Sequence, residues 1–377
     1  MNKTTAASAL GEDTVGIYLH IPFCLGKCYY CDFCSEAVPT ETKAAYVNAL
    51  CREISRFDGR AISVDTLFFG GGTPSLLLPA QVEQVLDALH ARFSFSKDVE
   101  CSMEVNPATV TREKAKAFVS LGINRFSVGI QSFSDRELHF LGRRHTAEEA
   151  VACVRILREA GNTNLNIDLM YGLAGQTTAD FRASVEKALS LAPEHLSAYA
   201  LSIEEGTPLH ANRHAYTFPS DDEVYEMYGM LTEKMKNSGY RHYEISNFAK
   251  EGYRCRHNLR YWEQKQYIGF GTAAHSYFGG RRYANGTKLA DYINGTGQVV
   301  CEGPQTKEAM MAERVMLALR LDTGISEELL AEVAPPASSA FVGECERAGY
   351  LSRRDGHIRL TDDGMYVSNS ILCGLLP

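Results

Sequence analysis

The sequence predicts an α/β fold in which parallel strands curve into an open or closed barrel. Short apolar segments alternate with helical segments six times between residues 15 and 201, and polar or glycine residues follow the ends of successive apolar segments. Strands that alternate with helices lie parallel and are joined by right-handed crossovers. Because barrel enzymes build their sites at the C-terminal ends of the strands, we expect the chemistry at that rim.

The predicted strands are short apolar runs. The first, at residues 15–21, alternates poorly and is apolar on both faces, as is typical of a buried parallel strand. The predicted strands lie at residues 15–21, 66–69, 100–105, 125–130, 165–170 and 196–201. Between them, apolar residues recur at spacings of three and four, which indicates helices. These helices are predicted at residues 40–57, 79–92, 111–121, 146–160 and 177–190.

The chain divides into four predicted regions. Residues 1–13 are expected to be a flexible tail, residues 14–215 the barrel, residues 216–303 an extension of the barrel, and residues 304–377 a small α+β domain. The extension is predicted to hold a helix at 219–239 and a strand-like run at 240–248. In the last region, helices at 306–320, 326–333 and 338–348 precede a hairpin at 351–360 and a final helix capped by Thr361. Three helices and a hairpin predict a winged-helix-like shape.

Composition limits the class of protein. The chain has 377 residues and a formal net charge of −8, which argues against a general nucleic-acid binder. Its eleven scattered cysteines do not resemble a disulfide framework. No secretory signal and no run of 18 apolar residues stand out. We therefore expect a cytoplasmic protein in a reducing compartment.

Three cysteines follow the first predicted strand at C-x3-C-x2-C spacing. They are Cys24, Cys28 and Cys31. Thiolates this close in sequence can converge on one small inorganic centre, and iron–sulfur cubanes take four such ligands. Three cysteines leave one iron open to a small molecule. A zinc site would present a second, distant pair of ligands, and the remaining cysteines offer none.

The flanking residues make the pattern Y-x-H-I-P-F-C-x3-C-x-Y-C-D-F, which resembles the radical SAM superfamily. Within it, the pattern is similar to the branch of oxygen-independent coproporphyrinogen oxidases and HemW-like heme chaperones. The resemblance implies a partial (β/α)6 barrel of the TIM type, a [4Fe-4S] cluster on Cys24, Cys28 and Cys31, and S-adenosylmethionine (SAM) on the open iron. It also implies reductive cleavage of SAM. Phe33 stands where the oxidases have an extra cysteine, and Cys34 is a bystander or has a redox role.

The same resemblance assigns SAM contacts to residues at the ends of the predicted strands. The glycine-rich motif and the polar strand ends are expected to bind the methionine and ribose parts, and an aromatic residue the adenine. These residues are Tyr18, Gly71, Gly72, Thr73, Glu104, Gln131 and Asp168. Arg144 is expected to pair with the SAM carboxylate, with Arg143 as the rival assignment.

The segment from His257 to Trp262 reads H-N-x-x-Y-W, a motif associated with heme binding in the HemW-like group. His257 is therefore a predicted axial ligand of heme iron. His275 is a weaker candidate and could instead line the SAM pocket. The resemblance implies heme as cargo, a heme-acceptor protein, and an electron donor such as flavodoxin or ferredoxin. It leaves open a peripheral membrane association through the acceptor.

Three functions remain open at this point. The first is a heme chaperone that transfers heme to acceptor proteins. The alternative is an oxygen-independent coproporphyrinogen III oxidase, and the third is a radical SAM enzyme that acts on another tetrapyrrole. Whether the protein is an enzyme is undecided. The short N-terminal tail, Phe33 and the H-N-x-x-Y-W segment favour the chaperone.

Overall fold

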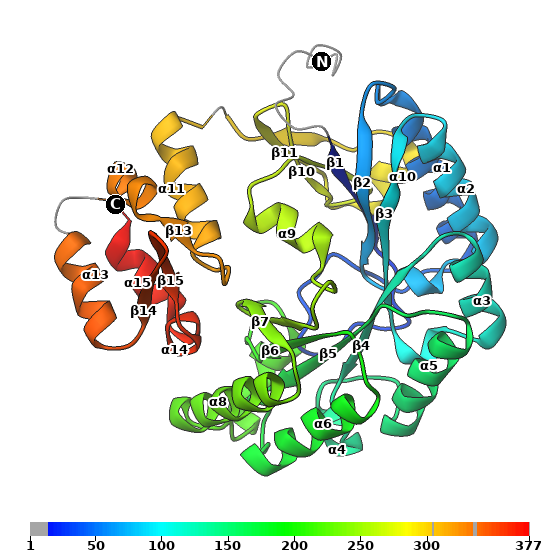
Figure 1. Ribbon diagram of the computed structural model, residues 1–377. Helices are drawn as coiled ribbons and strands as arrows, with labels where there is room; N and C mark the ends of the chain where they lie inside the picture. The colour runs from blue at the N-terminus through cyan, green and yellow to red at the C-terminus, as the bar shows by residue number, and fades with distance from the viewer. Residues whose placement is uncertain (1–13, 304, 335–337, 377) are drawn as a thin grey trace.

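The computed structural model describes residues 14–303, 305–334 and 338–376. Its main feature is a curved sheet with helices packed on its outer surface (Figure 1). The parallel strands at the centre of this sheet are neighbours in chain order: β1 Val15–Ile21, β2 Ser63–Gly71, β3 Ser94–Val105, β4 Arg125–Gln131, β5 Leu165–Tyr171 and β6 His195–Ala200. The predicted partial barrel of parallel strands is confirmed. The flexible tail predicted for residues 1–13 lies outside the described residues.

Helices connect these strands and cover the outside of the curve. They are α1 Thr40–Arg56, α2 Pro79–His90, α3 Arg112–Ser120, α4 Asp135–Phe140, α5 Ala147–Glu159 and α6 Thr178–Ser190. The predicted helices agree with these bounds to within one or two residues. Helix α4 was not predicted, because its six residues are too few for a periodic pattern to stand out.

Local sequence explains where several of these helices begin. Helix α5 (Ala147–Glu159) follows Thr146 and helix α6 follows Thr177, and each threonine accepts a hydrogen bond from the third helical residue. In both cases the carboxylate of that residue, Glu149 or Asp180, accepts a hydrogen bond from the backbone amide of the threonine. This reciprocal capping satisfies amides that the helix leaves free. The caps fix the ends of the loops that follow β4 and β5.

Each central strand has one apolar face and one polar face. In β1, Val15, Ile17, Leu19 and Ile21 belong to the main hydrophobic core beneath the helices, whereas Tyr18 lines a cavity inside the curve. Successive residues of a strand point to opposite faces. The expectation that the strand at residues 15–21 is apolar on both faces is therefore wrong for its inner face, because Tyr18 on that face lines a cavity inside the barrel.

The extension lengthens the sheet at both ends. Beyond β6 lie β8 Asn247–Ala249 and β7 Arg241–Glu244, both in antiparallel pairing, and beyond β1 lies β9 Tyr267–Phe270 in parallel pairing. The sheet continues through β10 His275–Phe278, β11 Arg281–Asn285 and β12 Val299–Cys301. The helices of this region are α7 Pro208–Asn212, α8 Asp221–Asn237, α9 Arg256–Trp262 and α10 Leu289–Asn294. The strand-like run predicted at 240–248 is thus two short strands joined by a turn.

Helix α9 lies inside the curve of the sheet rather than on its outer surface (Figure 1). It contacts β2 on one side and helix α11 (Lys307–Ala318) of the C-terminal region on another. The H-N-x-x-Y-W segment therefore closes one end of the barrel interior. The sequence predicted neither the helix nor this position.

The C-terminal region has its own hydrophobic cluster, which runs from Val315 to Leu375. After α11, its elements are β13 Ile325–Ser326, α12 Glu327–Val333, α13 Ser338–Arg347, β14 Leu351–Arg354, β15 His357–Leu360, α14 Asp362–Tyr366 and α15 Ser368–Leu375. The three strands form a small antiparallel sheet in the order β13-β15-β14, and Thr361 caps α14 as predicted. The α+β character predicted for this region is confirmed. The final helix is divided at Val367 into α14 and α15.

The C-terminal region is docked on the extension through polar contacts. Arg254 donates two hydrogen bonds to Asp322, at 2.9 and 2.6 Å, and the Tyr228 hydroxyl donates to the carbonyl of Asp362 at 2.7 Å. His242 Nδ1 lies 2.8 Å from the carboxylate of Asp362. Among the described residues, no helix combines the length and the apolar character needed to traverse a bilayer.

Candidate functional site

A cavity of about 490 Å³ occupies the inside of the barrel. Its walls come from the inner faces of the central strands, from the cysteine loop and from α9. The sequence-predicted site residues on its wall are Tyr18, Cys24, Cys28, Cys31, Gly71, Gly72, Thr73, Glu104, Gln131, Asp168 and His257. Three other candidates, Cys34, Arg144 and His275, are not among the lining residues. One chamber thus brings together most of the residues named from sequence.

The cysteine loop is tied to the barrel by backbone hydrogen bonds. The amide of Cys24 donates to the carbonyl of Glu36 at 3.1 Å, and the amide of Tyr29 donates to the carbonyl of Leu141 at 3.0 Å. The thiol of Cys24 also lies 3.5 Å from the hydroxyl of Thr73, at the end of β2. These contacts hold the loop over the C-terminal ends of the strands, where the cavity opens.

The three thiols of the cysteine loop are donors of the kind that an iron–sulfur cluster uses. Cys24, Cys28 and Cys31 are free and partly exposed, and all three line the cavity. A cluster spreads its thiolates over separate iron atoms. Within the described parts of the chain, no group of three or more His, Cys, Asp or Glu side chains that could hold one metal ion is found.

The glycine motif after β2 is shaped by two close backbone approaches. Gly71 has φ of +108°, a conformation that strongly favours glycine, and its amide donates to Glu104 Oε2 at 3.0 Å. A Cβ on Gly72 would lie 2.7 Å from the carbonyl oxygen of Phe23 and 2.9 Å from that of Ile21. The motif therefore packs directly under the start of the cysteine loop, and no side chain fits at Gly72.

Glu104 and Asp168 are partly buried carboxylic acids that line the cavity from neighbouring parts of the sheet. Burial, reinforced by the charge of Asp168, raises the pKa of Glu104 to about 8. Burial also raises the pKa of Asp168, although Asn166 and Ser127 donate hydrogen bonds to it at 2.7 and 3.1 Å. A cationic ligand in the cavity would favour the ionised form of both acids.

Gln131 ends β4 in a strained conformation. Its φ is +71°, which costs a residue other than glycine roughly 1–3 kcal/mol. The parallel ladder between β4 and β5 is irregular between Gly129 and Gln131, and Gln131 lines the cavity. Strain of this kind often marks a ligand contact. The register brings Gly129 opposite Asp168, so both strand ends face the same space.

The two adjacent arginines after β4 have different surroundings. Arg143 lines the cavity, donates to the carbonyl of Gly129 and lies with Nη1 3.6 Å from Sγ of Cys28. Arg144 is exposed, and its guanidinium lies against Gly26, where an added Cβ would collide with it. The geometry thus turns the rival candidate, Arg143, toward the interior and Arg144 toward the outer side of the cysteine loop.

Tyr18 and His20 form a short hydrogen-bonded chain beneath the cysteine loop. His20 Nε2 lies 2.8 Å from the carbonyl of Cys34, and because a carbonyl only accepts, this nitrogen carries the proton. The other nitrogen, Nδ1, then accepts from the Tyr18 hydroxyl at 3.1 Å. Burial lowers the pKa of His20, which keeps it neutral. His20 was not singled out from the sequence, although it stands two residues after Tyr18 in the loop pattern.

His257 is fully buried at the floor of the cavity, and both ring nitrogens have partners in the chain. Nδ1 lies 2.9 Å from the Thr66 hydroxyl, and Nε2 lies 2.8 Å from the Tyr261 hydroxyl. The ring stacks on Phe68, with centroids 5.2 Å apart. Burial lowers the pKa of His257 to about 3, so the ring is neutral. A metal would have to displace one of these hydroxyls to reach a ring nitrogen.

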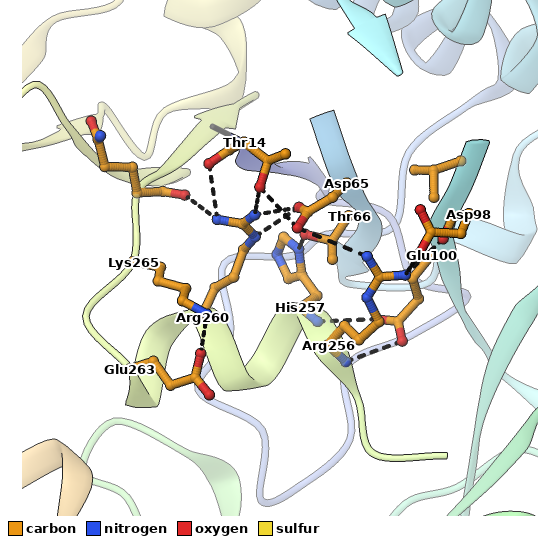
Figure 2. A network of polar contacts seen from close by, with 12 residues as sticks. Thr14, Asp65, Thr66, Asp98, Glu100, Arg256, His257, Arg260, Glu263 and Lys265 are labelled. Atoms are coloured by element: carbon orange, nitrogen blue, oxygen red, sulfur yellow. Dashed lines mark hydrogen bonds and ion pairs between the residues drawn. The ribbon is translucent and has the colours of Figure 1, made fainter. Parts of the chain in front are cut away.

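Figure 2 shows the polar network that holds α9 in place. Glu100 accepts from the backbone amides of Arg256 and His257, each at 3.1 Å, and so satisfies the start of the helix. Arg260 is 4% exposed and donates from Nε to Asp65 at 3.0 Å and from Nη2 to Thr14 at 2.8 Å. These bonds fasten the floor of the cavity to β2, β3 and the residue before β1.

His275 and Cys34 lie outside the cavity wall. His275 is exposed at the start of β10, and Cys34 donates from its thiol to the carbonyl of Thr287 at 3.4 Å. Other lining residues were missed from the sequence, among them Arg125, Tyr30 and Tyr199. Every second residue of β4 and β6 faces the inside of the barrel, and this rule would have found Arg125 and Tyr199. Tyr30 stands inside the cysteine loop itself.

The comparisons with known proteins agree with this geometry. The profile described as Radical SAM superfamily matches residues 18–188, and the profile described as HemN C-terminal domain matches residues 305–367. The heme chaperone HemW of Bacillus subtilis (strain 168) is 33% identical over 376 residues, which cover 95% of this chain and 98% of that protein. The heme chaperone HemW of Escherichia coli (strain K12) is 33% identical over 378 residues, which cover 95% of this chain and 97% of that protein.

Among solved structures, the radical SAM enzyme coproporphyrinogen III oxidase (HemN) of Escherichia coli superposes with a TM-score of 0.82. The match covers 96% of this chain and 90% of that chain at 23% identity, which establishes a shared fold. The identity to the HemW proteins is higher and extends over nearly the whole of both chains. This chain therefore belongs to the radical SAM superfamily and, within it, to the HemW family.

Proposed function

We propose that this protein is a heme chaperone that binds heme and transfers it to acceptor proteins. The observation that carries the proposal is the end-to-end similarity to HemW heme chaperones, at 33% identity over 95% of the chain. The alternative, an oxygen-independent coproporphyrinogen III oxidase, is not favoured, because the likeness to HemN at 23% identity is a likeness of fold.

Membership of the radical SAM superfamily implies an iron–sulfur cluster and SAM. We propose a [4Fe-4S] cluster on Cys24, Cys28 and Cys31, whose thiols face the cavity. When bound, the cluster and SAM supply one-electron reductive chemistry. The chain's own part is to hold the nucleotide: Glu104 and Asp168 receive its cationic groups, and Gly71, Gly72 and Thr73 allow close approach of the backbone.

The remaining SAM contacts follow from the cavity wall. Arg143 supplies a cation beside Cys28 and suits the SAM carboxylate better than Arg144, which faces outward. Gln131 and Tyr18 offer an amide and an aromatic ring for the ribose and adenine. Burial and the backbone contacts of the cysteine loop would exclude water from the reacting groups.

The cargo site rests on His257 as the proposed axial ligand. It lies on an aromatic wall made with Tyr18 and Phe68, whose rings stack on it at 26° and 24°. A planar macrocycle suits such a wall. Ligation requires that the Tyr261 hydroxyl leave Nε2. The proposal also includes an electron donor of the flavodoxin or ferredoxin type and a heme-acceptor protein. It further includes a membrane contact through that acceptor and a cytoplasmic location.

One experiment separates chaperone from oxidase. Protein with an anaerobically reconstituted cluster is given SAM, a reductant, and either hemin or coproporphyrinogen III. The chaperone proposal predicts a stoichiometric hemin complex, no decarboxylation of the porphyrinogen, and transfer of heme to an apo-acceptor. Catalytic release of carbon dioxide from coproporphyrinogen III would establish the oxidase instead.

A further inference from the structure

The floor of the cavity holds a buried cation that makes no direct hydrogen bond or ion pair with the described residues. Arg125, the first residue of β4, is 2% exposed and lines the cavity. Its Nε has no hydrogen-bond partner, although the charges of Glu100 and Asp168 are near enough to act on the guanidinium. Arginine carries five donors and a permanent charge. Buried donors without an acceptor are unfavourable, so their presence points to a ligand that supplies one.

The neighbouring strand adds a second unsatisfied group. Ser102 on β3 is directly opposite Arg125 in the parallel register and is fully buried. Its hydroxyl also has no hydrogen-bond partner. Ser102 is not among the residues that line the cavity, so the contact with a ligand falls to Arg125.

The nearby acids are already engaged elsewhere. Glu100 directs its oxygens to the backbone amides that start α9. Asp168 accepts from Ser127 and Asn166. The guanidinium of Arg125 therefore keeps its donors for something inside the cavity. The carboxylates of Glu100 and Asp168 act on its charge from nearby, but neither accepts a hydrogen bond from it.

The position of Arg125 separates it from the proposed SAM carboxylate site. Arg143 is anchored on the carbonyl of Gly129, four residues further along β4. At the rise of a strand this is roughly 13 Å. One cation thus stands at the rim, beside Cys28, and the other at the floor, beside α9. Each end of the cavity can hold a separate negative group.

We propose that Arg125 is the receptor for the carboxylate of an organic ligand bound between SAM and α9. A single planar guanidinium matches a carboxylate in charge and in two-pronged geometry, whereas a phosphate dianion would call for further cations. This inference rests on the proposed function, under which the carboxylate is a propionate side chain of heme. Arg125 then sets the orientation of the macrocycle against the His257 wall.

The test compares hemin with its dimethyl ester, in which both propionates are blocked. Binding is titrated by absorbance on the reconstituted protein with SAM present. Wild type is expected to bind the ester roughly 10- to 100-fold more weakly than hemin, the loss typical of a charge-assisted pair. Arg125→Met is expected to lose the same factor for hemin and to bind the ester as wild type does. Arg125→Lys should retain part of the preference for hemin.

Three controls keep the outcomes distinct. Arg256→Met removes an arginine from the outer side of α9 and should leave both titrations unchanged, since Arg256 pairs with Asp98 near the surface. Urea unfolding of Arg125→Met should give a midpoint close to that of wild type, because the guanidinium makes no direct ion pair that the variant would break. SAM affinity, measured by calorimetry, should be unchanged in Arg125→Met.

Several results would overturn the inference. Equal affinity of wild type for hemin and its ester would do so without any variant. Loss of SAM affinity in Arg125→Met, with hemin affinity retained, would assign the cation to the SAM carboxylate. A large drop in the unfolding midpoint would make Arg125 a structural residue. Failure of wild type to bind hemin at all would overturn the proposed function first, and this inference with it.

Discussion

Arg143 Nη1 lies 3.6 Å from Sγ of Cys28, so a partly buried cation faces one of the three thiols of the cysteine loop. The same guanidinium donates to the carbonyl of Gly129 at the end of β4. Arg143 therefore links the cysteine loop to the strand ends where the nucleotide is proposed to bind.

Replacing Arg143 should weaken SAM binding, whereas replacing its neighbour Arg144 should not. Arg143→Ala removes a cation from the cavity wall, and we expect SAM affinity to fall roughly 10- to 100-fold. Arg144→Ala is the matched control, because Arg144 is exposed outside the cavity. Calorimetric titration with SAM measures both. Equal losses in the two variants, or a loss confined to Arg144→Ala, would place the SAM carboxylate on the other side of the loop.

SAM affinity should rise with pH through the pKa of Glu104, which is about 8. Below that pH the acid is protonated and cannot pair with a cationic group of the ligand. We expect an increase of up to about tenfold between pH 6.5 and 8 and little change above. Glu104→Gln should lower the affinity and remove this dependence. A pH profile that is the same in wild type and Glu104→Gln would refute the assignment.

The same raised pKa makes a prediction for the protein without ligand. The folded state holds a proton on Glu104 that the unfolded state, with a pKa near 4.5, has released. The contribution of Glu104 to the free energy of unfolding is therefore present at low pH and is lost as pH rises from about 4.5 to 8. Urea unfolding at pH 6 and pH 8 measures this loss in wild type and in Glu104→Gln. The decrease in the free energy of unfolding between the two pH values should be larger for wild type.

The best test of heme ligation by His257 is a substitution of Tyr261, whose hydroxyl is bonded to Nε2 of His257. His257→Ala would leave Thr66 and Tyr261 without a buried partner and is expected to destabilise the fold, which confuses any binding result. Tyr261→Phe instead frees Nε2 and keeps the ring in place. If His257 is the ligand, this variant binds hemin more tightly and keeps the absorption spectrum of histidine-ligated heme. Unchanged affinity and spectrum would exclude His257 as the axial ligand.

Arg260 should matter for stability far more than the neighbouring Arg256. Arg260→Met would leave Asp65 partly buried without its partner, and breaking such a pair costs about 3–5 kcal/mol. Arg256→Met removes an ion pair with Asp98, which is 81% exposed, and a longer contact of 3.9 Å with Asp65, and should cost less than about 1 kcal/mol. Urea unfolding of both variants measures this. Similar losses in the two would mean that the Arg260 network does not hold α9.

The sequence predicted the strand ends well because parallel strands in register bring their C-terminal residues to one rim. Glu104, Gln131 and Asp168 were each named from an apolar run that stops at a polar residue, and all three line the cavity. Nothing in such a run distinguishes Arg143 from Arg144, since both stand in the same short loop. Their opposite directions depend on Gly26 and Gly129, which are distant in sequence.

The position of α9 could not be predicted for a similar reason. A seven-residue helix has too few turns for a clear periodic pattern, and it is held by Asp65 and Glu100 from strands more than 150 residues earlier. Arg125 was not singled out from the sequence, because it begins the predicted strand at residues 125–130 and only polar residues at the ends of strands were considered. Only the presence of a cavity explains why an arginine begins a buried strand.

The most direct test of the account is the iron and acid-labile sulfide content of single cysteine variants after anaerobic reconstitution. We predict about four iron and four sulfide per wild-type chain, the composition of the proposed cubane. Cys24→Ala, Cys28→Ala and Cys31→Ala should each lose most of both, while Cys34→Ala, whose thiol bonds to Thr287 outside the cavity wall, should keep them. Full iron and sulfide content in any of the first three variants, or zinc in the wild-type protein, would contradict it.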